Sequence, residues 1–126
     1  MFEKPYYKIS KKVKIDCNEK TLHYKSYFTF RGITLFTESG EKTEITNAKE
    51  AFRLLQLMIS FLSNQLVSGE KYYAGDIQLD LVLTDQCYLC FSFDTKNKKS
   101  IWFEKYEVRE FSEVLKHIIK SSDFLK

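Results

Sequence analysis

The sequence predicts an α+β fold in which twisted antiparallel sheet structure, made from two strands-then-helix halves, is backed by two helices. Aromatic residues make up 16% of the 126-residue chain, and they suit the pleated, half-buried surface of a sheet. Segments that alternate between polar and apolar residues precede a segment with helical spacing, and this order occurs twice. Since no proline- or serine-rich linker intervenes, we expect one domain over 1–126, with pseudo-repeat halves at about 1–69 and 70–126.

Four strand-like runs open the first half. Tyr6–Asp16 alternates along its whole length and reads as one strand, and Thr21–Arg31 alternates in the same way. The residues Cys17–Lys20 between them are typical of a hairpin loop, so we expect these two strands to pair. Glycines mark the turns into two shorter strands, Ile33–Thr37 and Lys42–Ile45.

A long apolar helix is predicted next, with Asn47 and Glu50 forming a capping-box-like start and Ser68-Gly69 ending the half. Its apolar positions cover most of its circumference, so we expect cover on more than one side, from a curved sheet or from a second subunit. We therefore predict a homodimer. The apolar positions are Ala51, Phe52, Leu54, Leu55, Leu57, Met58, Ile59, Phe61, Leu62 and Leu66.

The second half repeats the order. Strands are predicted at Asp76–Thr84, Cys87–Thr95 and Ser100–Glu104, followed by a helix from about Glu107. Helical spacing predicts that this second helix buries Val108, Phe111, Leu115 and Ile118. The pattern also suggests that Phe52 corresponds to Phe111, and Ile59 to Ile118, in a degenerate duplication.

Cysteine usage and hydropathy bear on the compartment. The three cysteines are an odd number, the N-terminus lacks the apolar core of a signal peptide, and no run reaches the ~18 apolar residues of a membrane span. We therefore expect a cytoplasmic protein without a membrane partner. Cys87 and Cys90 lie three apart in a predicted strand, so their side chains should point to opposite faces and form neither a zinc site nor a disulfide. No cofactor and no metal are expected.

Positive charge is concentrated at the start of the chain. The first 31 residues contain eight lysines and arginines but three acidic residues, whereas the net charge of the whole chain is +3. Such asymmetry can mark a surface that binds polyanions, although it is also common on solvated surfaces.

Basic and aromatic residues share one face of the first two predicted strands. Lysines and arginines neutralise phosphates, and exposed aromatic rings stack on unpaired bases, so this face predicts binding of RNA or single-stranded DNA without catalysis. The opposite interpretation, that the rings pack inside and the lysines only solubilise, weighs equally. The candidate binding residues are Tyr6, Lys8, Lys12, Lys14, Lys25, Tyr27 and Arg31, joined from the second half by Lys98, Lys99 and Trp102.

Two other classes of function stay open. The order helix, three strands, helix over residues 47–122 is that of the restriction-endonuclease-like core, and Asp94-Thr-Lys96 matches the acidic-x-lysine element of that family, with Asp80 or Asp85 as a second carboxylate. This resemblance implies a nuclease that depends on a divalent metal, although the same residues are also typical of a solvated hairpin turn. The third class is a protein-interaction module, such as an inhibitor or a chaperone, that docks through the apolar helix.

The layout resembles two families of nucleic-acid-binding proteins. Strands followed by a helix, twice in a short chain, are similar to Whirly-type single-stranded nucleic-acid-binding domains, and the segments Ser100–Glu104 and Val108–Leu115 are similar in style to their last strand and helix. Length and composition resemble those of PrgU-type proteins of enterococcal pheromone-responsive plasmids. That second resemblance implies a small cytoplasmic RNA-binding regulator that restrains production of conjugation surface proteins.

Overall fold

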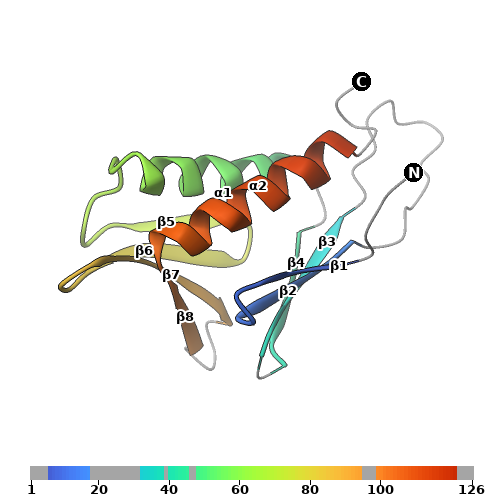
Figure 1. Ribbon diagram of the computed structural model, residues 1–126, viewed down its shortest axis with the longest axis horizontal. Coiled ribbons are helices and arrows are strands. Elements are labelled where there is room, and N and C mark those ends of the chain that lie inside the picture. The colour runs from blue at the N-terminus through green and yellow to red at the C-terminus, as the bar shows by residue number, and fades with distance from the viewer. Residues whose placement is uncertain (1–5, 18–31, 39, 46–47, 95–98, 122–126) are drawn as a thin grey trace.

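The computed structural model describes residues 6–17, 32–38, 40–45, 48–94 and 99–121, and these form two antiparallel sheets and two helices (Figure 1). The first sheet has the order β1 (Tyr6–Ile9), β2 (Val13–Cys17), β3 (Ile33–Thr37), β4 (Lys42–Ile45), and helix α1 (Ala48–Leu62) follows it. The second has the order β5 (Lys71–Ala74), β6 (Ile77–Leu83), β7 (Cys87–Asp94), β8 (Lys99–Phe103), and α2 (Lys105–Ser121) follows. The predicted α+β class and the repeated strands-then-helix order are confirmed.

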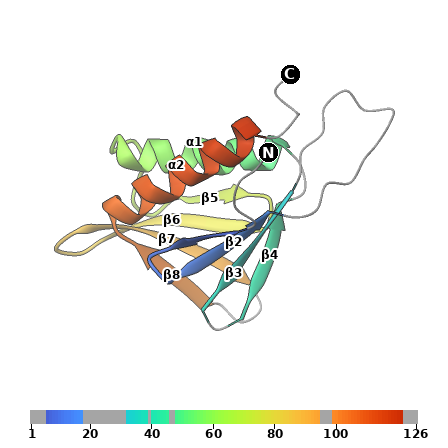
Figure 2. The same cartoon turned by 45° about the vertical axis from the view of Figure 1, so that its right-hand side comes forward.

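Both helices lie on the same side of the molecule, and the two sheets spread out beneath them (Figures 1 and 2). One hydrophobic cluster fills the space between these layers. It contains residues of both halves, such as Ile15 and Leu35 from the first sheet and Phe91 and Phe111 from the second half. The halves therefore share a core, because each sheet buries its apolar face against helices to which both halves contribute.

The buried positions of α1 and α2 can be aligned with one another, but the alignment differs from the one that the sequence suggested. Phe111 and Ile118 are buried, whereas Phe52 and Ile59 are 41% and 42% exposed. The predicted equivalence of these pairs is therefore wrong. Burial instead aligns Leu54 with Phe111 and Met58 with Leu115, and it confirms all four buried positions that were predicted for α2.

The predicted strand Tyr6–Asp16 is a hairpin of two strands. The chain reverses at Ser10 and Lys11, whose φ angles are 50° and 62°, and the N–H of Lys12 donates to the carbonyl of Ile9 at 2.8 Å. β2 pairs with β1 on one side and β3 on the other, so it cannot also pair with the run Thr21–Arg31. That run lies outside the described residues. The predicted pairing of two long strands is therefore wrong for β2.

Helix α1 ends at Leu62, before Leu66, the last apolar position that was predicted for it. Asn64 adopts a φ of 59°, its N–H donates to the carbonyl of Phe61 at 3.0 Å, and the N–H of Gln65 donates to Ser60 at 2.8 Å. This pattern is a Schellman cap, in which asparagine tolerates the left-handed conformation. The chain that follows this cap forms β5, a strand that was not predicted.

Candidate nucleic-acid interface

Three lysines and a phenylalanine form one line across the first sheet. Lys8 is paired in register with Lys14, Lys14 with Phe36, and Phe36 with Lys42, so each of the four strands contributes one residue. Register partners lie side by side on the same face of a sheet. The strand neighbours Ile9, Val13 and Leu35 are buried on the opposite face, which places these four on the outer one. We call Lys8, Lys14, Phe36 and Lys42 the lysine row.

The lysine row brings like charges together. Lys8 and Lys14 are directly opposed across β1 and β2, an arrangement that is unfavourable unless a negative charge lies nearby. The Lys14 ammonium lies 3.5 Å from a carboxylate oxygen of Asp16 and 5.8 Å from the centroid of the Phe36 ring. On one side, the adjacent line across the sheet contains Asp16, Thr34 and Glu44, so negative charge borders the lysine row there.

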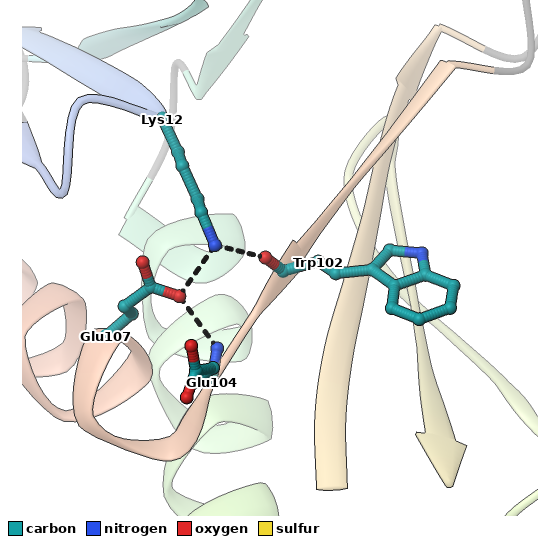
Figure 3. Close-up of polar contacts among 4 residues, drawn as sticks. All are labelled: Lys12, Trp102, Glu104 and Glu107. Carbon is teal, nitrogen blue, oxygen red and sulfur yellow. Dashed lines mark hydrogen bonds and ion pairs between the residues drawn. The ribbon is translucent and has the colours of Figure 1, made fainter. Parts of the chain in front are cut away.

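Lys12 does not belong to this face, and its predicted place beside Lys8 and Lys14 is wrong. It lies in the β1–β2 turn, where its ammonium donates to a carboxylate oxygen of Glu107 at 2.8 Å and to the backbone carbonyl of Trp102 at 2.7 Å (Figure 3). The side chain therefore joins the first hairpin to the start of α2 and to β8. We assign Lys12 a structural role.

Glu107 is the buried partner in this contact, with a side chain that is only 3% exposed. The same carboxylate oxygen accepts the N–H of Glu104 at 2.8 Å, the half of a capping box that Glu supplies in the first turn of a helix (Figure 3). Burial raises the pKa of Glu107, but hydrogen bonds from Lys12 and the Glu104 N–H, together with the charge of Lys12, outweigh burial and hold the pKa below its usual value.

Two aromatic residues lie together on the outer face of the second sheet. The ring centroids of Tyr88 and Trp102 are 5.4 Å apart, with an angle of 45° between the planes. Trp102 is 43% exposed, and its indole points away from the contact with Lys12 (Figure 3). Trp102 is paired in register with Cys90, which the indole N–H contacts, so the ring is held in place while part of its surface faces solvent.

Of the other predicted site residues, two are described by their backbone alone, and four lie outside the described residues. Tyr6 lies in β1 opposite Asp16, and Lys99 lies in β8 opposite Asp94, as backbone positions. Lys25, Tyr27, Arg31 and Lys98 lie outside the described residues.

Sequence reasoning missed Phe36 and Lys42 as site residues. Their strands were predicted correctly as Ile33–Thr37 and Lys42–Ile45. Alternation from the apolar Ile33 and Leu35 would have placed Phe36 on the outer face, and the tight turn after β3 would then have brought Lys42 beside it.

Cys87 and Cys90 lie on opposite faces of β7, as predicted. Cys87 is paired in register with Leu83 and is half-buried, whereas Cys90 is paired with Asp80 and Trp102 and is buried. Burial raises the pKa of the Cys90 thiol above its usual value. The two thiols are therefore separated by the strand itself.

The aspartates of the nuclease hypothesis come from different parts of the second sheet, with Asp80 in β6, Asp85 between β6 and β7, and Asp94 at the end of β7 as a backbone position. Asp80 is paired with Cys90, four positions before Asp94, which corresponds to roughly 13 Å along a strand. Asp85 lies beyond Leu83, near the opposite end of β7 from Asp94. Within the described part of the chain, no group of three or more His, Cys, Asp or Glu residues could hold a metal ion.

No protein-family model matches the chain, and no curated protein matches it significantly. None of the helices among the described residues is both long and apolar enough to cross a membrane. The lysine row and the Tyr88–Trp102 pair are therefore the features that bear on function.

Proposed function

We propose that this protein binds RNA or single-stranded DNA without catalysis and has a regulatory role in the cytoplasm, acting as a homodimer. The observation that carries this proposal is the lysine row, in which Lys8 and Lys14 are opposed on adjacent strands and Lys42 lies on the same line. A phosphate backbone laid along the row would pair with Lys8, Lys14 and Lys42 and release its own counterions. The resemblance to Whirly-type domains and PrgU-type regulators is part of the same proposal.

The form of the row favours a single strand over a duplex. On one side the row is bordered by a line of the sheet that carries Asp16 and Glu44. Phe36 lies between Lys14 and Lys42, so an aromatic ring is available between two phosphate contacts. Cations with an aromatic ring among them are typical of proteins that bind unpaired nucleic acid, whereas readers of the major groove insert a helix or a two-stranded ribbon.

The experiment removes the three charges together. In a fluorescence-anisotropy titration of a short labelled RNA and its DNA equivalent at several salt concentrations, the parent should bind with an affinity that falls as salt rises. Replacing Lys8, Lys14 and Lys42 by Gln should flatten the slope of log affinity against log salt by roughly 0.7 per lost contact. If this variant binds as the parent does over the whole salt series, the lysine row is not the interface.

A matched control separates this effect from the loss of net charge. Replacing Lys49, Arg109 and Lys116 by Gln removes the same charge from the outer surfaces of the two helices. This control should keep the slope of the parent. If neither the parent nor the control shows salt-dependent binding of RNA or DNA, the proposed function itself is wrong.

A further inference from the structure

The second sheet carries a row of residues in the same place as the lysine row of the first. In each sheet the first two strands close at a turn with a buried pair, Ile9–Val13 in one and Ala74–Ile77 in the other. The line across the sheet that follows this closing pair is the lysine row in the first sheet. In the second sheet the equivalent line takes one residue from each strand, and we call it the polar row: Tyr73, Gln78, Ser92 and Ser100.

The polar row differs from the lysine row in its chemistry. Its members are uncharged and offer hydroxyl groups and one carboxamide, whereas three of the four residues of the lysine row are cations. In the line beside the polar row, Lys71 is directly opposite Asp80, so charges of opposite sign lie next to each other there. Tyr73 and Trp102, on the two edge strands, are 53% and 43% exposed. The outer face of the second sheet therefore offers rings and neutral hydrogen-bonding groups where the first sheet offers cations.

We propose that this face binds the bases of the unpaired strand whose phosphates the lysine row holds, and that Gln78 selects the base. The inference rests on the proposed function and adds a base-binding part to the same interface. Bases are uncharged and planar, they stack on aromatic side chains, and their edges carry hydrogen-bond donors and acceptors. The Trp102 ring and the polar row are therefore complementary to bases, as the lysine row is to phosphates.

Lys12 holds the two parts of this interface close together. Its ammonium donates to the backbone of Trp102 at 2.7 Å, and Lys14 of the lysine row lies two strand positions, roughly 7 Å, from Lys12. A strand of a few nucleotides is long enough to reach from one part to the other.

Trp102 and Gln78 are held in place for this role. The indole N–H of Trp102 contacts Cys90, and the Tyr88 ring lies 5.4 Å from the indole. The Tyr73 hydroxyl donates to the carboxamide oxygen of Gln78 at 3.4 Å. A carboxamide oxygen can accept two hydrogen bonds, so Gln78 can still offer both an acceptor and a donor to a base. Since glutamine matches N6 and N7 of adenine in this way, we expect a preference for adenine.

Labelled RNA oligonucleotides of adenine, cytosine or uracil alone, each about ten nucleotides long, test this selection by fluorescence anisotropy. The parent should bind oligoadenylate about ten-fold more tightly than the other two. Gln78→Leu should remove the preference and keep the salt slope, because the lysine row stays intact. The matched control Gln56→Leu, at an exposed position of α1, should keep both. A parent without the preference, or a Gln78→Leu variant that retains it, overturns the inference.

Trp102 is the single tryptophan of the chain, so its fluorescence reports directly on this face. Saturating oligoadenylate should quench the fluorescence, because a base stacks on the indole. An abasic oligonucleotide of the same length carries phosphates without bases, and it should bind in a salt-dependent manner without quenching. Unchanged fluorescence with oligoadenylate, or equal quenching by the abasic strand, overturns the inference.

The same titrations separate this inference from the proposed function. Replacing Lys8, Lys14 and Lys42 by Gln should weaken the binding of all three oligonucleotides and leave the preference for adenine unchanged. Salt-dependent binding without base preference and without quenching would overturn the base-binding role and leave the lysine row as the interface. If the parent binds none of the oligonucleotides, the proposed function fails and the inference fails with it. Far-UV circular dichroism confirms that each variant is folded.

Discussion

Lys12 and Glu107 lie 95 positions apart in the sequence, and the 2.8 Å ion pair between them fastens the first hairpin to the start of the last helix. The pair is asymmetric, because Glu107 is buried whereas Lys12 is half-exposed. Removing the lysine would leave a buried carboxylate without its cation. The pair is therefore more consequential for stability than a surface ion pair of the same length.

Lys12→Gln should lower the free energy of unfolding by about 2 kcal/mol, the scale of a lost hydrogen bond to a charged group. Urea unfolding followed by circular dichroism measures the difference. Lys8→Gln is the control, and since Lys8 is exposed on β1 it should change the same quantity by less than about 0.5 kcal/mol. Equal effects of the two substitutions would contradict the structural role assigned to Lys12.

Lowering the pH should reduce the free energy of unfolding, in part because Glu107 becomes protonated. Its pKa is lower in the folded than in the unfolded chain, so the charged form stabilises the fold above the unfolded pKa of about 4.3. That contribution is lost as the pH falls through the folded pKa. Glu107→Gln should therefore be clearly less stable than the parent at neutral pH, and the difference should shrink below about pH 4. Unfolding free energies measured at a series of pH values check this, and a constant difference would argue against it.

Trp102→Ala should weaken binding of a short labelled RNA by about 1–3 kcal/mol through lost stacking, with little change in the salt slope. The control is Tyr106→Ala, which removes another exposed aromatic ring, 58% exposed in the first turn of α2. Thermal unfolding of both variants shows whether the loss of the Tyr88 contact also affects folding. If both variants bind RNA as the parent does, Trp102 is not part of the interface.

Lys11→Gly should raise the free energy of unfolding by about 0.5–1 kcal/mol. Lys11 has a φ of 62°, a conformation that is unfavourable for residues with a Cβ and open to glycine. The gain is reduced because glycine also makes the unfolded chain more flexible. Chemical denaturation measures this change in the free energy of unfolding. A loss of stability would show that the Lys11 side chain contributes a stabilising contact.

The sequence was sufficient for strands and helices whose patterns are local. β3 and β4 match their predicted bounds, and the buried face of α2 follows directly from its helical spacing. The β1–β2 hairpin was missed because its turn contains no Gly, Asn or Pro. In addition, Ile9 and Val13 are an even number of positions apart, so both fall on the buried face whether or not the chain reverses between them.

The candidate site was only partly predictable for a related reason. Lys8 and Lys14 were placed correctly, since alternation decides which face a strand residue occupies. Lys12 was misplaced because its role depends on Glu107, a distant residue that no local pattern connects to it. The exposure of Phe52 and Ile59 depends on where α2 and the sheets contact α1, which is equally invisible in the sequence.

The hydrogen bond from Lys12 to the backbone of Trp102 also bears on aggregation. β8 is the edge strand of the second sheet, and the unpaired carbonyls of an edge strand can recruit a strand from another molecule. The Lys12 ammonium occupies one of these carbonyls and places a charge where an incoming strand would have to pair. The residue that fastens the two halves together therefore also discourages edge-to-edge polymerisation of the folded protein.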